Sequence, residues 1–302
     1  MSAPLTVGVT GASGFLGGAL CDALAARGDA VRRFVRGRAP EPGEIAWEPA
    51  GGGLEPAALE GLDAIVHLSG ASLAARRWTP AWKRELMASR VRSTATLAHA
   101  IAACRRPPRV LLSGSAVGWY GDRGDEPLDE ASPPGHGFLA ELAQSWEEAA
   151  EPAAEAGVRV AHPRAGLVLA RGRGVLGALE PAFKLGVGGP LAGGHAFWSW
   201  IAVGDYVQAL LLAIADERLR GAFNAVSPTT VRQGEFARAL GRALHRPAAI
   251  PAPSFALRLL LGRERADEML LASQRVRPAM LLAAGFRFAE PDLEPFLVRT
   301  YA

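Results

Sequence analysis

The sequence predicts an α/β protein in which helices cover both faces of a mostly parallel, doubly wound sheet. Through the first two-thirds of the chain, short apolar runs alternate with stretches of helical periodicity, and a glycine-rich turn joins the first run to the first helical stretch. Strands that alternate with helices pair in parallel, because each crossover helix returns the chain to the same end of the sheet. With 302 residues, of which 49% are apolar, the chain can bury a substantial core.

The strands and helices expected in this part follow one another at the spacing of β-α-β units. Apolar runs such as LTVGVT and AIVHL are typical of strands that are buried on both faces. Gly28 and Gly157 follow two of the helical stretches, where a glycine ends a helix because it adopts left-handed backbone conformations without strain. We therefore expect strands at Leu5–Thr10, Ala30–Val35, Ile45–Trp47, Ala64–Leu68, Arg109–Ser113 and Val158–His162, and helices at Phe15–Arg27, Pro80–Cys104 and Phe138–Ala156.

The pattern changes after Ala165. Glycine and proline are dense in Arg171–Gly194, which predicts loops there. Beyond this segment we expect a strand at Phe197–Ile201, a helix at Asp205–Ala215, a strand at Phe223–Val226 and proline-broken helices in Arg232–Ala302.

The composition excludes several classes of function. The formal net charge is only +3 and no block of five like charges occurs, so no surface for nucleic acid or an anionic membrane is expected. No apolar stretch approaches the ~20 residues of a membrane span, and the chain enters its first strand without a leader-like segment, so we expect a cytoplasmic protein. Two cysteines cannot form a disulfide framework, and the histidines include no H-x-x-x-H pair, so no metal site is expected.

The strongest functional signal is the turn after the first strand, where three glycines have G-x-x-G-x-x-G spacing. The first glycine permits a tight turn, the second lets the backbone approach a pyrophosphate, and the third lets the helix pack closely on the strand. The amino-terminal end of the helix then offers free N–H groups and a partial positive charge to phosphates. We therefore predict a dinucleotide site at Gly11, Ala12, Ser13, Gly14, Phe15, Leu16 and Gly17.

The end of the second expected strand indicates which dinucleotide binds. NAD sites usually place an acid there for the ribose 2′-hydroxyl, whereas NADP sites place an arginine for the 2′-phosphate. Here Val35 and Arg36 are followed by Gly37 and Arg38, and no acid is present. Arg36 is placed for a charge-assisted hydrogen bond to a phosphate, although a solvated surface arginine would look the same in sequence. We predict NADP(H) as the cofactor.

A domain organisation follows from the glycine turn and the later change of pattern. We predict that residues 1–165 form the NADP-binding domain and that the chain returns to it at about 200–226. Residues 166–199 and 227–302 then form a smaller, mostly helical lobe that binds a small-molecule substrate.

The chain resembles a known superfamily at several separate motifs. The glycine turn, DAIVHLSGA at 63–71, SGSAVGWYG at 113–121 and WIAVGD at 200–205 are similar to those of an extended short-chain dehydrogenase/reductase. RRW at 76–78, GGPLAGG at 188–194, FWSWI at 197–201 and HRP at 245–247 resemble its "epimerase family" branch, whose members carry their own C-terminal domain. The resemblance implies a Rossmann fold, NADP(H) binding and, as a habit of the superfamily, a homodimer.

The resemblance also implies further cofactor contacts. Leu68, Ser69 and Gly70 would border the cofactor ribose, although Gly70 alone could be a turn glycine. Glu85 and Arg90 match positions near the cofactor, although Glu85 alone could be a solvated helix charge. Arg164 would lie near the nicotinamide half.

The chain departs from the superfamily at the catalytic pair. Ordinary members carry Tyr-x-x-x-Lys on a helix, where the lysine lowers the pKa of the tyrosine. None of the three tyrosines here is followed by a lysine four residues later. Phe138 and Leu142 stand at the two positions, and neither side chain can transfer a proton.

Other polar residues are candidates for catalysis. Ser115 matches the hydroxyl that bonds the substrate carbonyl in the superfamily, although a turn serine bonding its own backbone would look the same. Tyr120 and Glu141 are candidate proton carriers. Two functions therefore stay open. One is an NADP(H)-dependent oxidoreductase or epimerase, and the other is a non-catalytic NADP(H)-binding sensor that regulates a partner.

Overall fold

The computed structural model describes residues 3–49, 51 and 53–302. These residues form two compact units. The first contains the described residues of Met1–Ser115 together with Leu142–Pro163 and Leu210–Ala222, and the second contains Ala116–Glu141, Arg164–Ala209 and Phe223–Ala302. This division rests on compactness alone, so the predicted division into a cofactor domain and a substrate lobe stays a prediction.

The main sheet has the order β12-β8-β5-β4-β1-β2-β3, and the pairs from β3 to β8 are parallel. The chain leaves β1 toward β2 and β3, and later strands are added on the other side of β1. This reversal makes the gap between β1 and β4 a topological switch point, where α/β proteins bind their ligands. The strands are β1 (Thr6–Thr10), β2 (Ala30–Val35), β3 (Glu44–Ala46), β4 (Ala64–His67), β5 (Val110–Ser113), β8 (Arg159–Ala165) and β12 (Gly221–Ala225).

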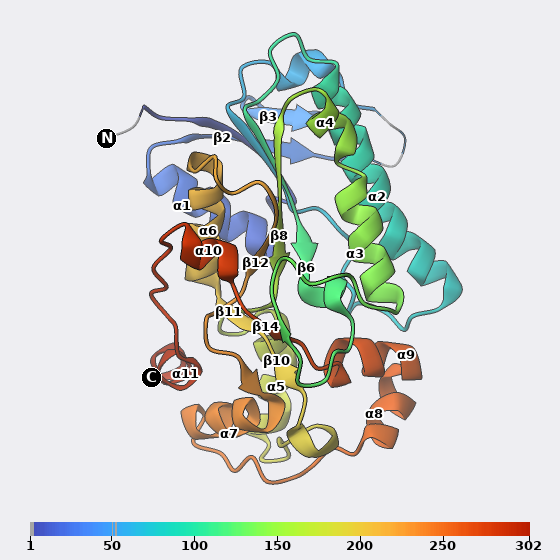
Figure 1. Ribbon diagram of the computed structural model, residues 1–302, viewed down its shortest axis with the longest axis vertical. Helices are drawn as coiled ribbons and strands as arrows, with labels where there is room; N and C mark the ends of the chain where they lie inside the picture. Colours follow the sequence, from blue (N-terminus) through green and yellow to red (C-terminus); the bar gives the residue numbers. More distant parts are fainter. Residues whose placement is uncertain (1–2, 50, 52) are drawn as a thin grey trace. The chain divides into compact units, whose positions relative to one another are not determined.

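Helices of the first unit lie against both faces of this sheet (Figure 1). α1 (Phe15–Ala26) contacts β1 and β2, and α2 (Pro80–Ala102) contacts α4 (Glu151–Glu155) on the other side. The fold class predicted from the alternation of strands and helices is therefore confirmed.

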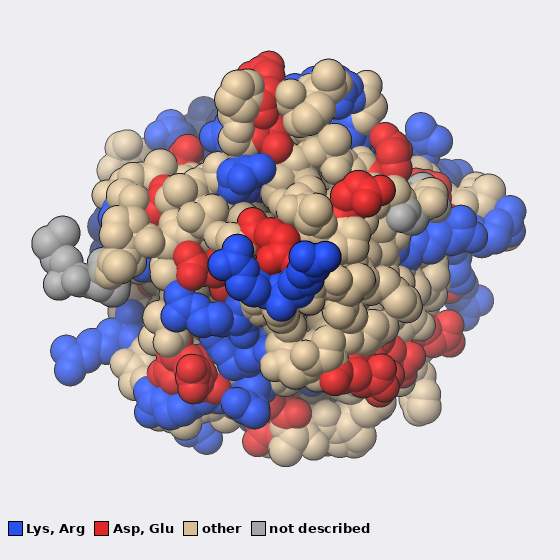
Figure 2. Space-filling model, turned by 90° about the horizontal axis from the view of Figure 1, so that it is seen from above, with Lys and Arg blue, Asp and Glu red and all other residues tan. Residues whose placement is uncertain are grey.

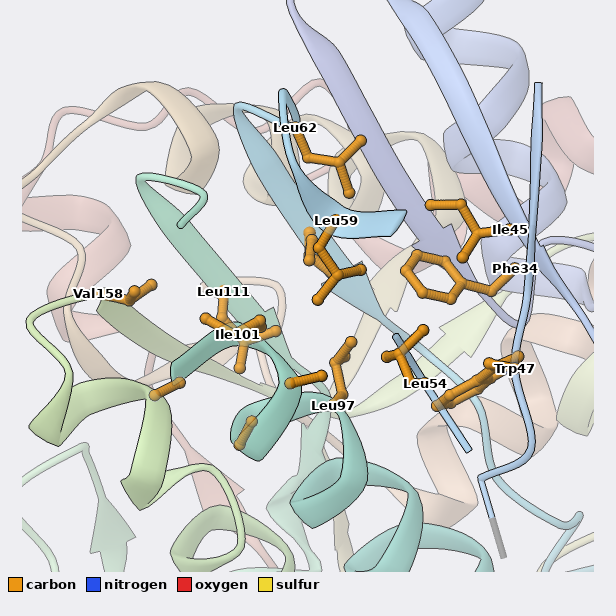
Figure 3. Packing of buried hydrophobic residues seen from close by; sticks show 14 of the residues in the cluster. Phe34, Ile45, Trp47, Leu54, Leu59, Leu62, Leu97, Ile101, Leu111 and Val158 are labelled. Carbon is orange, nitrogen blue, oxygen red and sulfur yellow. The ribbon is translucent and has the colours of Figure 1, made fainter. Parts of the chain in front are cut away.

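The core beneath α2 fixes the strands that lead to the switch point. Figure 3 shows Ile101, which lies one turn after Leu97 on α2, beside Leu111 of β5. The ring of Phe34 meets that of Trp47 edge-on at 5.5 Å between centroids, and Trp47 meets His67 in the same way at 5.8 Å. Such edge-to-face pairs add to the stabilisation that burial provides.

The second unit is built from short strand pairs and helices around its own core. Trp198 packs edge-on against Phe236 at 5.1 Å, and Trp200 stacks on Phe296 at 5.7 Å. The strand pairs are β10 (Phe197–Trp198) with β13 (Val231–Arg232), β11 (Trp200–Ala202) with β9 (Leu167–Leu169), and β14 (Arg275–Val276) with β7 (Pro127–Leu128). The helices include α5 (Gly174–Lys184), α7 (Gln233–Ala243), α8 (Ser254–Leu261), α9 (Arg263–Ala266), α10 (Ala279–Ala283) and α11 (Leu293–Tyr301).

Two segments differ from the sequence-based expectation because of proline and of an internal serine. The helix expected at 138–156 breaks into α3 (Phe138–Glu148) and α4, because the ring of Pro152 clashes with the carbonyl four residues earlier and lacks an N–H. The strand expected at 197–201 is two strands, which part at Ser199. Its hydroxyl donates to the Gln274 carbonyl, and the strands on either side pair with different partners.

The prediction of loops in 171–194 is wrong for part of the segment, because it contains α5. Its glycines and Pro181 gave a loop signal, but Leu176 and Phe183 lie two turns apart on one face and are buried in the second core. The carboxylate of Glu180 also accepts hydrogen bonds from the Gly172 N–H and the Tyr301 hydroxyl. Burial and these bonds outweigh the local preference. The other expected strands and helices are present with ends shifted by up to three residues.

The surface carries charges of both signs. On the face drawn in Figure 2, lysine and arginine side chains lie interspersed with aspartate and glutamate. Among the described residues, the helices are all too short or too polar to span a membrane.

Candidate functional site

The glycine turn is as tight as its spacing predicts. Gly11 has a φ of +66°, and a Cβ on Gly11 would lie 2.9 Å from the carbonyl of Leu68. A Cβ on Gly17 would lie 2.2 Å from the Gly11 oxygen, which no side chain can tolerate. The Gly14 N–H donates to the same Gly11 oxygen at 2.9 Å. Glycine is therefore required at the first and third positions for the helix to approach the strand.

The amino-terminal end of α1 fits an anion. Its N-cap is Gly14, so no side chain caps the first turn, and that turn contains no acid. Ser13 and Gly14 are exposed. The first N–H groups of a helix have no partner within the helix, and its dipole places partial positive charge there. The residues present in this turn therefore fit a pyrophosphate.

A buried polar network joins the end of β4 to the glycine turn. The Thr10 hydroxyl oxygen accepts from the N–H groups of Leu68 at 3.1 Å and Ser69 at 3.3 Å, so its proton is left to donate to His67 Nδ1 at 2.7 Å. His67 Nε2–H then donates to the Ser93 hydroxyl at 3.2 Å. Burial, together with the charge of Arg90, lowers the pKa of His67 to about 3, so the imidazole is neutral.

Arg90 is a buried cation at the same edge of the sheet. A Cβ on Gly70 would lie 3.1 Å from its guanidinium carbon, so the backbone of Gly70 lies against this charge. Arg90 Nη1 donates to the Leu86 carbonyl at 3.3 Å, and the guanidinium lies 5.1 Å from the ring centroid of Trp146. Among the described residues no carboxylate pairs with Arg90, and burial lowers its pKa to about 10. A buried cation without a counter-charge is costly, so this position favours a bound anion.

At the end of β2, the predicted cofactor contact Arg36 differs from the nearby Arg38 in its partners. Arg36 follows the last residue of β2 and is exposed, and among the described residues it has no hydrogen-bond or ion-pair partner. Arg38, in contrast, pairs with Glu44 at 2.6 Å. Val35 is half-buried, and Glu85 is exposed on α2.

Ser115 has a partner that sequence reasoning missed. Its hydroxyl is buried and donates to Glu147 Oε1 at 2.6 Å. Glu147 lies on α3, on the same helix as Phe138 and Leu142, and it also lines a cavity of about 700 Å³. No local motif could reveal this pair, because its members are 32 residues apart. Ser115 is therefore not a turn serine that bonds only its own backbone.

Tyr120 and Arg164 lie together in the second unit. The Tyr120 hydroxyl donates to Asn224 Oδ1 at 2.7 Å and accepts from Arg164 Nη1 at 3.1 Å. The Arg164 guanidinium stacks 3.7 Å from the ring centroid of Trp119. Burial raises the pKa of the Tyr120 hydroxyl, so it keeps its proton at neutral pH. A catalytic role for Tyr120 stays a prediction, but these bonds give the hydroxyl a structural one.

The two residues that the resemblance places at the positions of the catalytic pair are apolar and buried. Phe138 and Leu142 are both in the core, whereas Glu141 is exposed. The Glu268 carboxylate accepts from the N–H groups of Phe138 at 3.0 Å and Leu139 at 2.7 Å, and so caps α3. Among the described residues, no cluster of three metal-ligating side chains occurs.

Comparison with known proteins identifies the family. Residues 7–225 match the family described as the NAD dependent epimerase/dehydratase family. An epimerase family protein of Mycobacterium leprae is 42% identical over 282 residues, which are 93% of this chain and 91% of that protein. The chain belongs to the NAD dependent epimerase/dehydratase family.

Solved structures of this epimerase/dehydratase family agree with that assignment. The human epimerase family protein SDR39U1, crystallised with NADPH, is 36% identical with a TM-score of 0.90, covering 98% of this chain and 99% of that chain. A nucleoside-diphosphate sugar epimerase from Corynebacterium glutamicum is 34% identical with a TM-score of 0.81, but this chain covers only 58% of it. Residues 252–299 match a separate domain of unknown function, DUF1731. The resemblance to the epimerase branch of the superfamily is confirmed.

The neutral His67 predicts a pH dependence of folding in this epimerase-family chain. Because its folded pKa is about 3 and the unfolded value is about 6.5, the unfolded state binds an extra proton between these values, and stability falls as the pH falls below about 6.5. From pH 6.5 to 5.5 this group should remove about 1 kcal/mol of unfolding free energy.

Urea unfolding of the wild type, His67→Gln and the exposed control His99→Gln at both pH values measures this effect. We expect the pH-dependent loss to shrink in His67→Gln only. An unchanged pH dependence in His67→Gln would show that the imidazole is not held neutral by the fold.

Proposed function

We propose that this epimerase-family chain binds NADP(H) and acts as an NADP(H)-dependent oxidoreductase or epimerase on a small-molecule substrate. The observation that carries the proposal is the buried Arg90, which has no carboxylate partner among the described residues and lies against Gly70 at the switch point. The tight glycine turn follows β1, the strand next to β4, and leads into the uncapped end of α1. Both features support the proposal. The NADPH in the crystal structure of the human relative supports it further.

The chain's own residues would hold the cofactor at both of its phosphate-bearing parts. The turn Gly11–Gly17 would take the pyrophosphate on backbone N–H groups, with Leu68, Ser69 and Gly70 at its side. Arg36 would hold the 2′-phosphate, and Val35 would contact the adenosine next to it. Arg90 and Glu85 would contact the cofactor from α2, and Arg164 would face the nicotinamide half.

The Ser115–Glu147 pair supplies the proton chemistry that the absent tyrosine and lysine cannot. NADP(H), when bound, supplies hydride exchange at a carbon that bears oxygen. In the oxidation direction, the substrate hydroxyl gives its proton to Ser115 Oγ as Ser115 passes its own proton to Glu147. In reduction both protons move the other way. Glu147 lines a cavity of about 700 Å³, through which water can restore its protonation state.

A second function is favoured by the buried, apolar residues at the catalytic positions. Phe138 and Leu142 are in the core, and the Tyr120 hydroxyl is engaged within the fold. These features suit a chain that binds NADP(H) without turning over a substrate and reports the redox state of the cofactor to a partner. Turnover decides between the two functions.

Replacement of Arg36 by alanine tests the choice of cofactor. A charge-assisted bond to a phosphate contributes about 1.5–3 kcal/mol, so the Kd for NADPH should rise about 10- to 100-fold. The Kd for NADH should change by less than about twofold, since NADH lacks this phosphate. Isothermal titration measures both values. Arg38→Ala is the matched control, because Arg38 pairs with Glu44 instead. Equal losses for the two cofactors would refute the role of Arg36.

Replacement of Ser115 or Glu147 tests the proton route. NADPH oxidation is followed with a panel of aldehydes, ketones and quinones, and kcat with the fastest acceptor should fall about 100- to 10,000-fold in Ser115→Ala and in Glu147→Gln. Glu147→Asp should recover part of the loss. The neighbouring Glu148→Gln is the control, and Tyr120→Phe and Glu141→Gln test the other candidates. NADPH binding without turnover of any acceptor would instead support the sensor.

A further inference from the structure

A basic cavity lies at the amino-terminal end of α2, within the first unit. Its volume is about 540 Å³, which is within the range of small-ligand sites. The side chains that line it differ from those of the glycine turn and include no buried apolar cluster. They are Arg76, Arg77, Thr79, Ala81, Trp82 and Glu85.

Local hydrogen bonds give this cavity a defined wall. The Trp78 indole N–H donates to the Leu73 carbonyl at 3.0 Å and holds the loop that precedes α2. The Thr79 hydroxyl accepts from the Trp82 N–H at 3.2 Å and caps the helix. The Arg76 guanidinium then lies 4.9 Å from the ring centroid of Trp82. One arginine is therefore held over an aromatic face in the wall of the cavity.

The cavity is lined by more cationic than anionic side chains. Arg76 and Arg77 line it with only one carboxylate, that of Glu85, and the first turn of α2 contains no acid. Trp82 Nε1 is buried and has no hydrogen-bond partner among the described residues, so an acceptor from outside the chain would satisfy it. A guanidinium fork is suited to the oxygens of phosphate and carboxylate groups. Two independent features, the arginine pair and the indole N–H, thus favour a ligand that brings oxyanion acceptors.

We propose that the cavity at Arg76, Arg77 and Trp82 binds an oxyanion group of the substrate, a phosphate or a carboxylate. The proposal rests on the proposed function, because Glu85 belongs both to this cavity and to the predicted cofactor contacts, which places the two sites next to each other. The substrate is then a phosphorylated or carboxylated compound that also carries the hydroxyl or carbonyl group for hydride exchange. Under the proposed function, the phosphates of the cofactor itself would have other partners in the first unit, at the glycine turn and Arg36.

Anion titration of the full-length protein tests the site without knowledge of the substrate. Inorganic pyrophosphate and succinate are titrated separately into protein saturated with NADPH, and binding is followed by heat and by tryptophan fluorescence. One of the two should bind at a single site, which tells phosphate from carboxylate recognition. Trp82→Phe should remove the fluorescence response and weaken the binding measured by heat, because phenylalanine lacks the indole N–H that the anion would accept from.

The double variant Arg76→Gln, Arg77→Gln should weaken this binding at least tenfold and leave the Kd for NADPH within about twofold. Arg84→Gln is the matched control, since Arg84 is exposed on the same helix and does not line the cavity. Unchanged thermal midpoints show that each variant is folded.

Three results would overturn the proposal. They are no binding of either anion to the wild type, equal binding to the double variant, or a matching loss of NADPH affinity, which would assign the cavity to the cofactor. If NADPH itself fails to bind, the proposed function is wrong. The same titrations without NADPH still compare the wild type with the double variant.

Discussion

The close contact between the Gly11 carbonyl and Cα of Gly17 is the constraint on which the site depends. A Cβ at Gly17 would lie 2.2 Å from that oxygen, so α1 can approach β1 only with glycine there. This approach aims the uncapped amino-terminal end of α1 along the edge where β1 and β4 end. A chain without this contact could keep the sheet but would lose the position from which backbone N–H groups reach a phosphate.

The polar groups around this contact fix the neighbouring loops by buried hydrogen bonds. Thr10, His67 and Ser93 form a chain of hydrogen bonds that fixes the backbone after β4, and the neutral imidazole adds no charge there. Among the described residues of this region, Arg90 is the only buried charged side chain that has no carboxylate partner. The fold therefore concentrates unsatisfied positive potential at the place where the family's cofactor phosphates are expected.

Local signals in the sequence predicted most of the fold and the turn, but they could not predict the partners. Strand runs, the glycine spacing and the lack of a lysine four residues after any tyrosine can each be recognised within a short stretch of sequence. The bonds from Ser115 to Glu147 and from Phe138 to Glu268 join residues 32 and 130 positions apart, so only the folded chain brings them together. α5 was missed for the same reason, since its glycines and proline are outweighed by burial against distant residues.

The most direct test of the account compares Gly17→Ala with Gly18→Ala by NADPH titration. A Cβ on Gly18 would lie 3.6 Å from the Ala12 oxygen, an ordinary contact, so the two variants differ in the clash at the turn and little else. The account predicts that Gly17→Ala raises the Kd for NADPH at least tenfold, whereas Gly18→Ala stays near the wild type and both keep their circular dichroism spectra. Equal NADPH affinity in a folded Gly17→Ala variant would contradict it.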